Sequence, residues 1–280
     1  MTISYYTKKD IKYIINEKNS SIKITSFKKP LKITGTRFGA ILGKNPYKSP
    51  FQAWCEIFNL YEEKEFLHEK HWYDYFLDFL KDIFFGPNKS YSHKTVGKII
   101  ERKIITYSKN VFFSDPNYHI ITPKEDFSYD FFPKYDIFGG CWDALLYNKK
   151  YHKIESILEI KTTSLNNKKD WIQKKIPEQY LLQASFYAYL SKVKTVHMII
   201  AFLNEKDYQY PKNFIPGKHD VLDYQFHLKD QYPYFSDLIQ LSKNWWNQYV
   251  LSKNSPPLQS EKDRKLLEII RGSSKFQGCN

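Results

Sequence analysis

Apolar residues along the chain follow two periodicities, which predict a mixture of helices and strands. Between Val96 and Tyr107 they recur every three to four residues, as in an amphipathic helix. The runs 138–147 and 153–164 are rich in apolar and β-branched residues and flank the polar residues NKKYH, so they predict a hairpin. The run VHMIIAFL at 196–203 predicts a strand that is buried on both faces.

Capping residues and breakers mark the boundaries of further helices. Thr36 is expected to cap a short helix that ends at Leu42, before Gly43. Ser49 and Pro50 are expected to form the cap and first turn of the next helix. Other helices are predicted from the apolar spacing between Phe66 and Phe85, from Pro177 to about Ser191, near 234–252 and near 260–271.

The remaining segments carry weaker signals. Residues 1–32 show little periodicity, 86–95 are typical of a connecting loop, and 111–136 appear irregular or weakly stranded. A chain of 280 residues can bury a full core, and without a repeat or a clear boundary we expect one α/β domain over 1–280. Residues 61–95 are a possible helical insertion within it.

Composition restricts the class of protein and of partner. Hydrophobic residues at 42% and charged residues at 26% are typical of a folded soluble chain. Lys and Arg number 43 against 30 Asp and Glu, so the formal charge is +13, which favours a polyanionic partner such as nucleic acid. A surplus of Lys also follows from an AT-rich coding genome, so the charge alone does not decide.

The cysteines and the N-terminus indicate a compartment. Cys55, Cys141 and Cys279 are widely spaced and form no C-x-x-C pair, so we expect free thiols in a reducing environment and no structural zinc site. No stretch has the apolar core of a signal peptide or the length to span a bilayer. The sequence therefore predicts a cytoplasmic protein without a membrane partner.

Candidate chemistry begins in the second predicted strand of the hairpin. Side chains alternate along a strand, so Glu159 and Lys161 lie on one face, about 7 Å apart, while Leu158 and Ile160 face the other way. A surface ion pair is the common explanation of an isolated E-x-K. A carboxylate and an ammonium on an otherwise apolar strand are costly, however, unless they are paired, bound to a metal or placed at a cleft.

Two more carboxylates can join this pair. Asp143 sits in the preceding strand, and antiparallel pairing brings it beside Glu159. Converging carboxylates repel each other, and a hard divalent cation relieves the repulsion, so Mg²⁺ or Mn²⁺ is expected. Glu101 lies toward the apolar face of its helix, one turn after Gly97. It is a structural acid, a solvated helix residue or a third member of the site.

Gln183 shares a helix face with Tyr180 and Tyr187. It is either a polar residue on a packed amphipathic helix or a hydrogen-bonding group that orients a water or phosphate beside the metal.

The order of these motifs is characteristic. It runs Gly97-x-x-x-Glu101, Gly140-x-x-Asp143, Glu159-x-Lys161 and Pro177-x-x-Tyr180-x-x-Gln183-x-x-x-Tyr187. This order resembles the PD-(D/E)XK nucleases, in particular the lambda-exonuclease-like or YqaJ-type viral recombinase branch and its RecB-like relatives. The segments ITGTRFGAILGKNPYKSPFQAW and NWWNQYVLSKNSPPL are similar to the N-terminal signature and the C-terminal ending of that branch, so the resemblance spans residues 33–257.

The chain departs from the pattern in places. Asp143 follows Trp142 rather than proline, and 61–95 is longer than expected. Relatives with an iron–sulfur cluster need four cysteines, and the chain has three.

The resemblance implies a restriction-endonuclease-like core, a mixed central sheet flanked by helices, with helical elaborations at both ends. It implies that Asp143, Glu159 and the Ile160 carbonyl bind the metal, with Glu101 ligating it through water or helping to hold a second ion. Lys161 would position or deprotonate the attacking water, and Gln183 would orient it. The expected activity is exonucleolytic hydrolysis of linear duplex DNA in recombination or repair, leaving 5′-phosphates.

DNA contacts are expected on basic and aromatic residues around this centre. The candidates are Thr36, Arg37, Lys168, Lys169, Trp171, Lys174, Lys175 and Tyr187. Trp171 either stacks on a base or anchors a lid to the core. An endonuclease of restriction or repair type, or an inactive DNA-binding module, remain alternatives, and a single-strand annealing protein and a homo-oligomer are possible partners.

Overall fold

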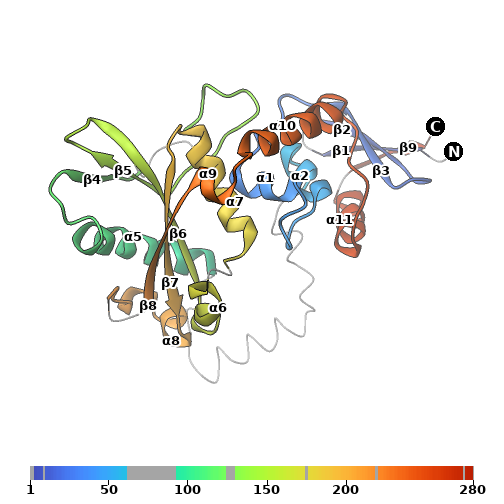
Figure 1. Ribbon diagram of the computed structural model, residues 1–280. Coiled ribbons are helices and arrows are strands. Elements are labelled where there is room, and N and C mark those ends of the chain that lie inside the picture. The colour runs from blue at the N-terminus through green and yellow to red at the C-terminus, as the bar shows by residue number, and fades with distance from the viewer. Residues whose placement is uncertain are drawn as a thin grey trace, which may run out of the picture. The chain divides into compact units, whose positions relative to one another are not determined.

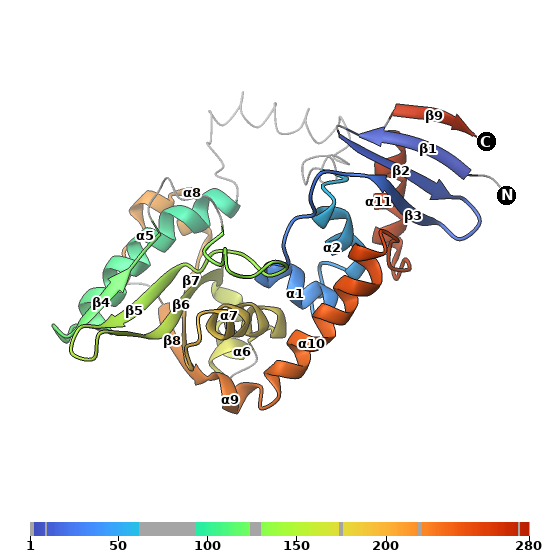
Figure 2. The same cartoon turned by 90° about the horizontal axis from the view of Figure 1, so that it is seen from above.

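The computed structural model describes residues 3–8, 10–61, 93–123, 130–173, 176–217, 220–273 and 275–279. The chain divides into two compact units (Figures 1 and 2). The first unit comprises Met1–Trp72, Phe132–Gly140 and Tyr234–Asn280, and the second comprises Tyr73–Phe131 and Cys141–Pro233. Compact units of this kind can belong to one domain, so the single domain over 1–280 stays a prediction. The possible insertion at 61–95 and the helix at Phe66–Phe85 fall almost wholly outside the described residues.

A five-stranded mixed sheet forms the centre of the second unit. Its strand order is β4-β5-β6-β7-β8, and only β6 and β7 run parallel. The strands are β4 (Tyr118–Ile121), β5 (Ala144–Asn148), β6 (Lys153–Ser164), β7 (Thr195–Leu203) and β8 (Asp220–His227). The predicted hairpin is confirmed, with Ala144 opposite Leu158.

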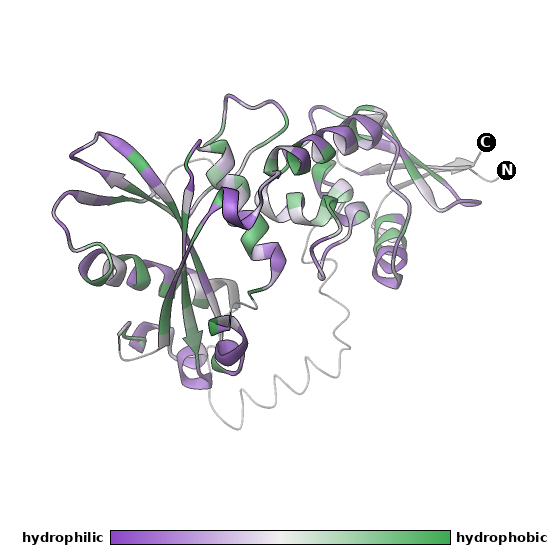
Figure 3. Cartoon of the chain, in the orientation of Figure 1, coloured by the Kyte–Doolittle hydropathy of each residue, from purple (hydrophilic) through white to green (hydrophobic). Residues whose placement is uncertain are grey.

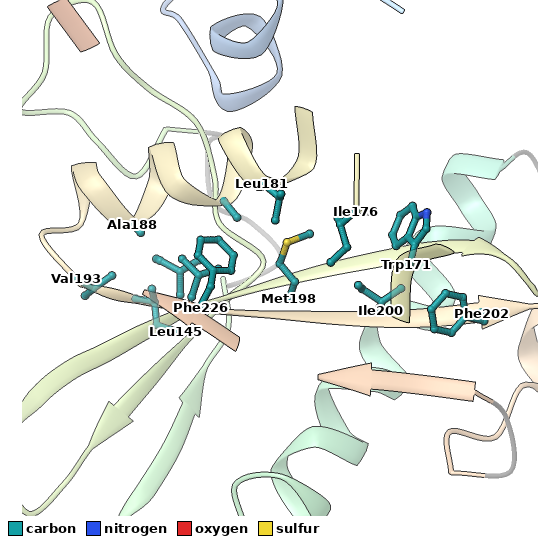
Figure 4. Packing of buried hydrophobic residues seen from close by; sticks show 13 residues of the cluster. Leu145, Trp171, Ile176, Leu181, Ala188, Val193, Met198, Ile200, Phe202 and Phe226 are labelled. Atoms are coloured by element: carbon teal, nitrogen blue, oxygen red, sulfur yellow. The ribbon is translucent and has the colours of Figure 1, made fainter. Parts of the chain in front are cut away.

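Helices cover both faces of this sheet, as Figures 1 and 2 show. Helix α5 (His93–Val111) packs Val96, Ile100 and Ile104 against one face. Helix α7 (Glu178–Leu190) packs against the other (Figure 4). Shorter elements complete the unit: η1 (Leu165–Asn167), α6 (Lys168–Ile172), α8 (Glu205–Gln209), η2 (Pro211–Asn213) and α9 (Leu228–Gln231).

The alternation of β6 distributes its side chains between these two layers. Leu158 and Ile160 face the α5 side, whereas Ile157 packs on the α7 side. Strand β7 is buried along nearly its whole length, as its apolar run predicts. The predicted α/β class, with a mixed central sheet flanked by helices, is confirmed.

The first unit contains an antiparallel sheet of order β3-β2-β1-β9. It consists of β1 (Ile3–Lys8), β2 (Ile11–Asn16), β3 (Ser21–Ser26) and β9 (Lys275–Cys279). Tyr13, Ile15, Ile22 and Ile24 are buried at 0–1% exposure, and the Tyr13 hydroxyl donates to the Ile270 carbonyl at 3.2 Å.

Helices pack beside this sheet. They are α1 (Gly35–Ile41), α2 (Pro50–Ile57), α10 (Phe235–Trp245), the π-helical η3 (Trp246–Leu251) and α11 (Glu261–Gly272). In Figure 3, α11 carries apolar residues on one side and polar residues on the other, which fits a helix that packs on a core. Ser49 caps α2 as predicted and also donates to Asp263 at 2.5 Å, which ties α2 to α11.

Two boundary predictions were wrong. Thr36 does not cap α1, because the helix begins at Gly35 and Thr34 is the cap residue. Asp143 does not lie within a strand, because β5 begins at Ala144. Residues 1–32, which showed little periodicity, contain β1, β2 and β3, and the sequence also gave no expectation for β8 or β9.

Candidate active site

Strand β6 carries the centre of the candidate site. Glu159 is fully buried, with 1% of its side chain exposed, and its Oε1 accepts hydrogen bonds from two donors. These donors are Lys161 Nζ at 2.6 Å and Gln183 Nε2 at 2.7 Å. The predicted grouping of Glu159, Lys161 and Gln183 is therefore present. Gln183 contacts the carboxylate itself, so the structure makes it a residue that positions Glu159.

The second oxygen of Glu159 has a different environment. Oε2 is buried and has no hydrogen-bond partner, although it is an acceptor of full strength. Leaving a buried carboxylate oxygen unsatisfied costs free energy, so the site is suited to a positive group at that position.

Asp143 lies directly before the first residue of β5, beside β6. Its Oδ2 accepts the main-chain N–H of Ile160 at 2.7 Å, so a side chain takes the place of a strand partner at that point. Gly140, three residues earlier, has φ +129, a conformation that favours glycine and lets the chain turn away from the ladder. An extended residue points its N–H and C=O to the same edge, so the Ile160 carbonyl lies on the edge that Asp143 occupies.

Glu101 approaches from α5 on the other face of the sheet. It is half-buried, and burial, followed by repulsion from Asp143, raises its pKa from 4.5 to about 7. Lys161 opposes this rise by attraction. Because Asp143 influences the Glu101 carboxyl, the two carboxylates belong to one electrostatic cluster, as the sequence predicts. The role of Glu101 as a member of the site stays a prediction.

Burial and the interactions between neighbouring charges also shift the pKa values of Glu159, Asp143 and Lys161. Burial, followed by repulsion from Asp143, raises the pKa of Glu159 to about 7. Burial also raises the pKa of Asp143, against the attraction of Lys161 and the Ile160 N–H. Burial alone would lower the pKa of Lys161, but attraction to Glu159 and Asp143 outweighs it, so its pKa is raised and the ammonium stays charged.

Cys141 is a neighbour that the sequence did not place at the site. Burial and then the charges of Asp143, Glu101 and Glu159 raise the pKa of its thiol to about 12. It is therefore a neutral thiol, and Cys55 and Cys141 are free, as predicted.

Tyr180 was quoted only as part of a motif, yet it contacts the site. Lys161 Nζ lies 5.4 Å from the centre of its ring, in cation–π geometry. The spacing of three residues from Gln183 to Tyr180 along α7 was the available signal, because residues so spaced share a helix face.

The donor set fits a hard divalent cation that keeps other ligands. In the described part of the chain, no three His, Cys, Asp or Glu side chains form a complete metal-binding group by themselves. Mg²⁺ is commonly held by one or two carboxylates together with waters and substrate phosphates. Glu159 Oε2, Asp143 and the Ile160 carbonyl offer such a partial set of hard oxygen ligands.

The predicted DNA contacts near α6 have mixed outcomes. Lys168 is half-buried and Lys169 exposed, whereas Lys174 and Lys175 lie outside the described residues. Trp171 is only 6% exposed and packs against Tyr180. It also packs against Phe202 (Figure 4). Its indole is thus not available to stack on a base, and the structure supports the alternative of an anchor in the core.

Burial or ion pairing limits the access of DNA to two other predicted contact residues, Tyr187 and Arg37. Tyr187 is 4% exposed and packs beside Phe186, so its ring does not present a surface to DNA. In the first unit, Arg37 pairs with Glu56 at 3.2 Å and donates to the Lys32 carbonyl at 2.7 Å. That pairing partly neutralises Arg37, and a role of Thr36 and Arg37 in DNA binding stays a prediction.

None of the helices in the described ranges has both the length and the apolar character that a membrane span requires.

Comparisons with known proteins agree with the motif order. The model of the YqaJ-like viral recombinase domain matches residues 27–194. The MG373 protein of Mycoplasma genitalium is 28% identical, over 81% of this chain and 83% of its own length. YqaJ of Bacillus subtilis is 27% identical, over 55% of this chain and 38% of its own.

Solved structures show a weaker likeness. The alkaline exonuclease of Laribacter hongkongensis in complex with dAMP is 9% identical at a TM-score of 0.46, over 86% of this chain and 92% of that one. A phage-related exonuclease from Haemophilus somnus is 12% identical at a TM-score of 0.40, over 79% and 96%. These scores are too low to support a conclusion.

The family match covers more than half of the chain and contains Glu101, Asp143, Glu159 and Lys161. The chain belongs to the YqaJ-like viral recombinase domain family.

Proposed function

We propose that this protein is a Mg²⁺-dependent deoxyribonuclease, and that it acts as an exonuclease on linear duplex DNA. The observation that carries the proposal is the buried Glu159 carboxylate, whose Oε1 is held by Lys161 and Gln183 while Oε2 has no partner. A carboxylate fixed in this way presents one oxygen to a cation. Lys161 beside it offers a permanent positive charge to a phosphate.

Each group has a role that its position supports. Glu159 Oε2, Asp143 and the Ile160 carbonyl would hold the cation, and Glu101 would contribute through water. Bound there, Mg²⁺ would polarise the scissile phosphate and lower the pKa of an attacking water. Lys161 would position that water and offset charge on the phosphate oxygens. Gln183 keeps the Glu159 carboxylate in orientation, a supporting contact of the kind that tunes metal sites.

DNA is the proposed substrate because membership of a recombinase family and a charge of +13 both favour it. Hydrolysis in which water attacks phosphorus and the 3′ oxygen leaves would give 5′-phosphate products. A free duplex end, a single-strand annealing partner and assembly into a homo-oligomer are further predictions of the family resemblance.

A restriction or repair endonuclease would use the same groups, and end-dependence separates the two activities. An inactive DNA-binding module is disfavoured, because Lys161 donates a hydrogen bond to Glu159 and Asp143 accepts one from the Ile160 N–H. The charge of Asp143 also acts on Glu101.

The first experiment compares digestion of linear and covalently closed duplex DNA with Mg²⁺, Mn²⁺ and EDTA. Glu159→Ala and Lys161→Ala should each lower the rate by about 10² to 10³ or more, as the loss of one electrostatic contact to the transition state does. Glu155→Ala and Lys153→Ala are matched controls, because the same residue types stand on β6 in its partly exposed first half.

Three outcomes are informative. Loss of linear DNA alone, abolished in both site variants but not in the controls, supports the exonuclease. Equal cutting of closed circles would identify an endonuclease. The absence of cutting with either metal would refute the catalytic proposal. Ligation of the products without prior phosphorylation tests for 5′-phosphates.

A further inference from the structure

A groove of about 480 Å³ lies in the second unit beside α5, outside the site described above. Arg102, Thr106 and Asn110 line it at successive turns of α5, and Tyr107 lies between them. Its opposite wall is the segment Phe214–Pro216. Arg102 directly follows Glu101, but neighbouring residues on a helix point about 100° apart, so the groove occupies a different flank of the same helix.

The wall of the groove is held in place by two contacts. Lys103 Nζ donates to the carbonyls of Lys212 at 2.5 Å and Phe214 at 2.8 Å. Gly217 has φ +91, and a Cβ there would come within 2.9 Å of the Tyr107 ring. The close approach of Gly217 to Tyr107 and the two bonds from Lys103 fix the wall against α5, so the groove is preformed.

The groove is positively charged and largely apolar. Its lining residues, all within the described ranges, include Arg102 and Lys103 and no acidic residue. The bonds that Lys103 makes to the wall are to carbonyl groups, which do not cancel its charge. Ile215, Pro216 and Tyr107 supply flat or apolar surface next to these cations.

We propose that this groove binds a single-stranded segment of DNA, with a base against Tyr107 and the 214–216 wall and a phosphate near Arg102. The volume suits a single nucleotide unit. Aromatic surface combined with basic side chains is the usual platform for single strands, and it binds without reading sequence. The proposal rests on the nuclease function, because the strand would come from the duplex whose phosphodiester lies at the site lined by Glu101.

The test measures binding of a fluorescent oligothymidylate by anisotropy, in full-length protein carrying Glu159→Gln so that the strand stays intact. Arg102→Gln should weaken binding roughly ten-fold and make the slope of log affinity against log salt shallower by about 0.7. Thr106→Glu, which adds a negative charge inside the groove at an exposed helix position that tolerates Glu, should weaken it further.

Lys109 supplies matched controls, since it is an exposed cation on the same helix and does not line the groove. Lys109→Gln should change the affinity by less than about two-fold, and Lys109→Glu by less than about three-fold. Equal losses in the Arg102 and Lys109 variants would overturn the proposal. Thermal melting checks that each variant is folded.

Two further arms separate the alternatives. Thymidine 5′-monophosphate should compete only weakly, and competition as strong as that of the oligonucleotide would identify a mononucleotide site instead and overturn the strand proposal. Nuclease activity is measured in parallel with Glu159 intact. Nuclease activity together with binding that does not depend on Arg102 would refute the proposal of a strand-binding groove and leave the nuclease function standing. A lack of activity with groove-dependent binding refutes the nuclease function alone.

Discussion

At the scale of single residues, the two carboxylate oxygens of Glu159 differ in their hydrogen-bond partners. Oε1 is occupied by Lys161 and Gln183, and Oε2 is buried without a partner. Gln183 contributes a neutral donor, so its loss leaves the charges unchanged and removes one of the two hydrogen bonds that hold Oε1.

We therefore predict that Gln183→Ala raises the Mg²⁺ concentration needed for half-maximal activity by about 10-fold to 100-fold, the usual cost of removing a support of a metal ligand. Excess Mg²⁺ should restore most of the rate. A metal titration of wild type and variant checks this, with Gln240→Ala, an exposed glutamine of α10, as the control. An unchanged metal requirement combined with a lower maximal rate would instead place Gln183 at the attacking water.

The sequence predicted which residues of the candidate site lie together better than it predicted their contacts. The period of two along a strand is enough to put Glu159 and Lys161 on one face, and antiparallel pairing is enough to bring Asp143 near. That Asp143 would accept the Ile160 N–H, and that Gln183 would hold Glu159 rather than a water, depends on tertiary spacing between α7, β5 and β6, which no local pattern encodes.

At the scale of elements, α6 shows how a short helix is fixed. It has five residues, too few to be stable alone, and its buried Trp171 packs between Tyr180 and Phe202. The basic residues of α6 thus lie on a helix whose buried Trp171 packs into the core.

Trp171→Ala should lower the free energy of unfolding by about 3–5 kcal/mol, because it leaves a cavity in the core beneath α7. Trp171→Phe, which fills more of the space, should cost less. Chemical denaturation of the two variants measures the difference. If Trp171→Ala kept its stability and lost DNA affinity, the tryptophan would be a base-stacking residue after all.

Elements with strong periodicity or clear caps were predicted well, and β1 to β3 were not. Their alternation was present, since Tyr13 with Ile15 and Ile22 with Ile24 are buried on one face. Each strand has only six residues, however, and frequent Lys residues obscure so short a pattern. Strand β9 could not be predicted locally, because its partner β1 lies at the other end of the sequence.

At the scale of the whole molecule, the cluster of carboxyls couples stability to pH. Glu101 and Glu159 have a pKa of 4.5 ordinarily and about 7 in the fold, so the folded chain binds more protons between these values. Stability falls with rising pH wherever the folded state binds more protons. The contribution is fully present below about pH 4.5 and is lost as the pH rises through 7.

The metal-free protein should therefore melt at a higher temperature at pH 5.5 than at pH 8, and Glu159→Gln should flatten this dependence. Millimolar Mg²⁺ should raise the melting temperature at pH 8 more than at pH 5.5, since a cation competes with protons for the carboxylates. Differential scanning calorimetry with EDTA or Mg²⁺ measures both effects. A wild-type profile that Glu159→Gln leaves unchanged would count against the charge cluster.

The pairing of β1 with β9 has a consequence for folding. Ser4 lies opposite Cys279, so this contact closes a loop of nearly the entire chain, whereas β5, β6 and β7 pair over short separations. Contacts so distant in sequence carry a large entropic cost of closure and form late. During synthesis, β1, β2 and β3 emerge long before β9, so the edge of β1 that pairs with β9 stays unpaired until β9 has been made. During that interval the edge is open to pairing with another nascent chain, and this is where misassembly at high expression is expected to begin.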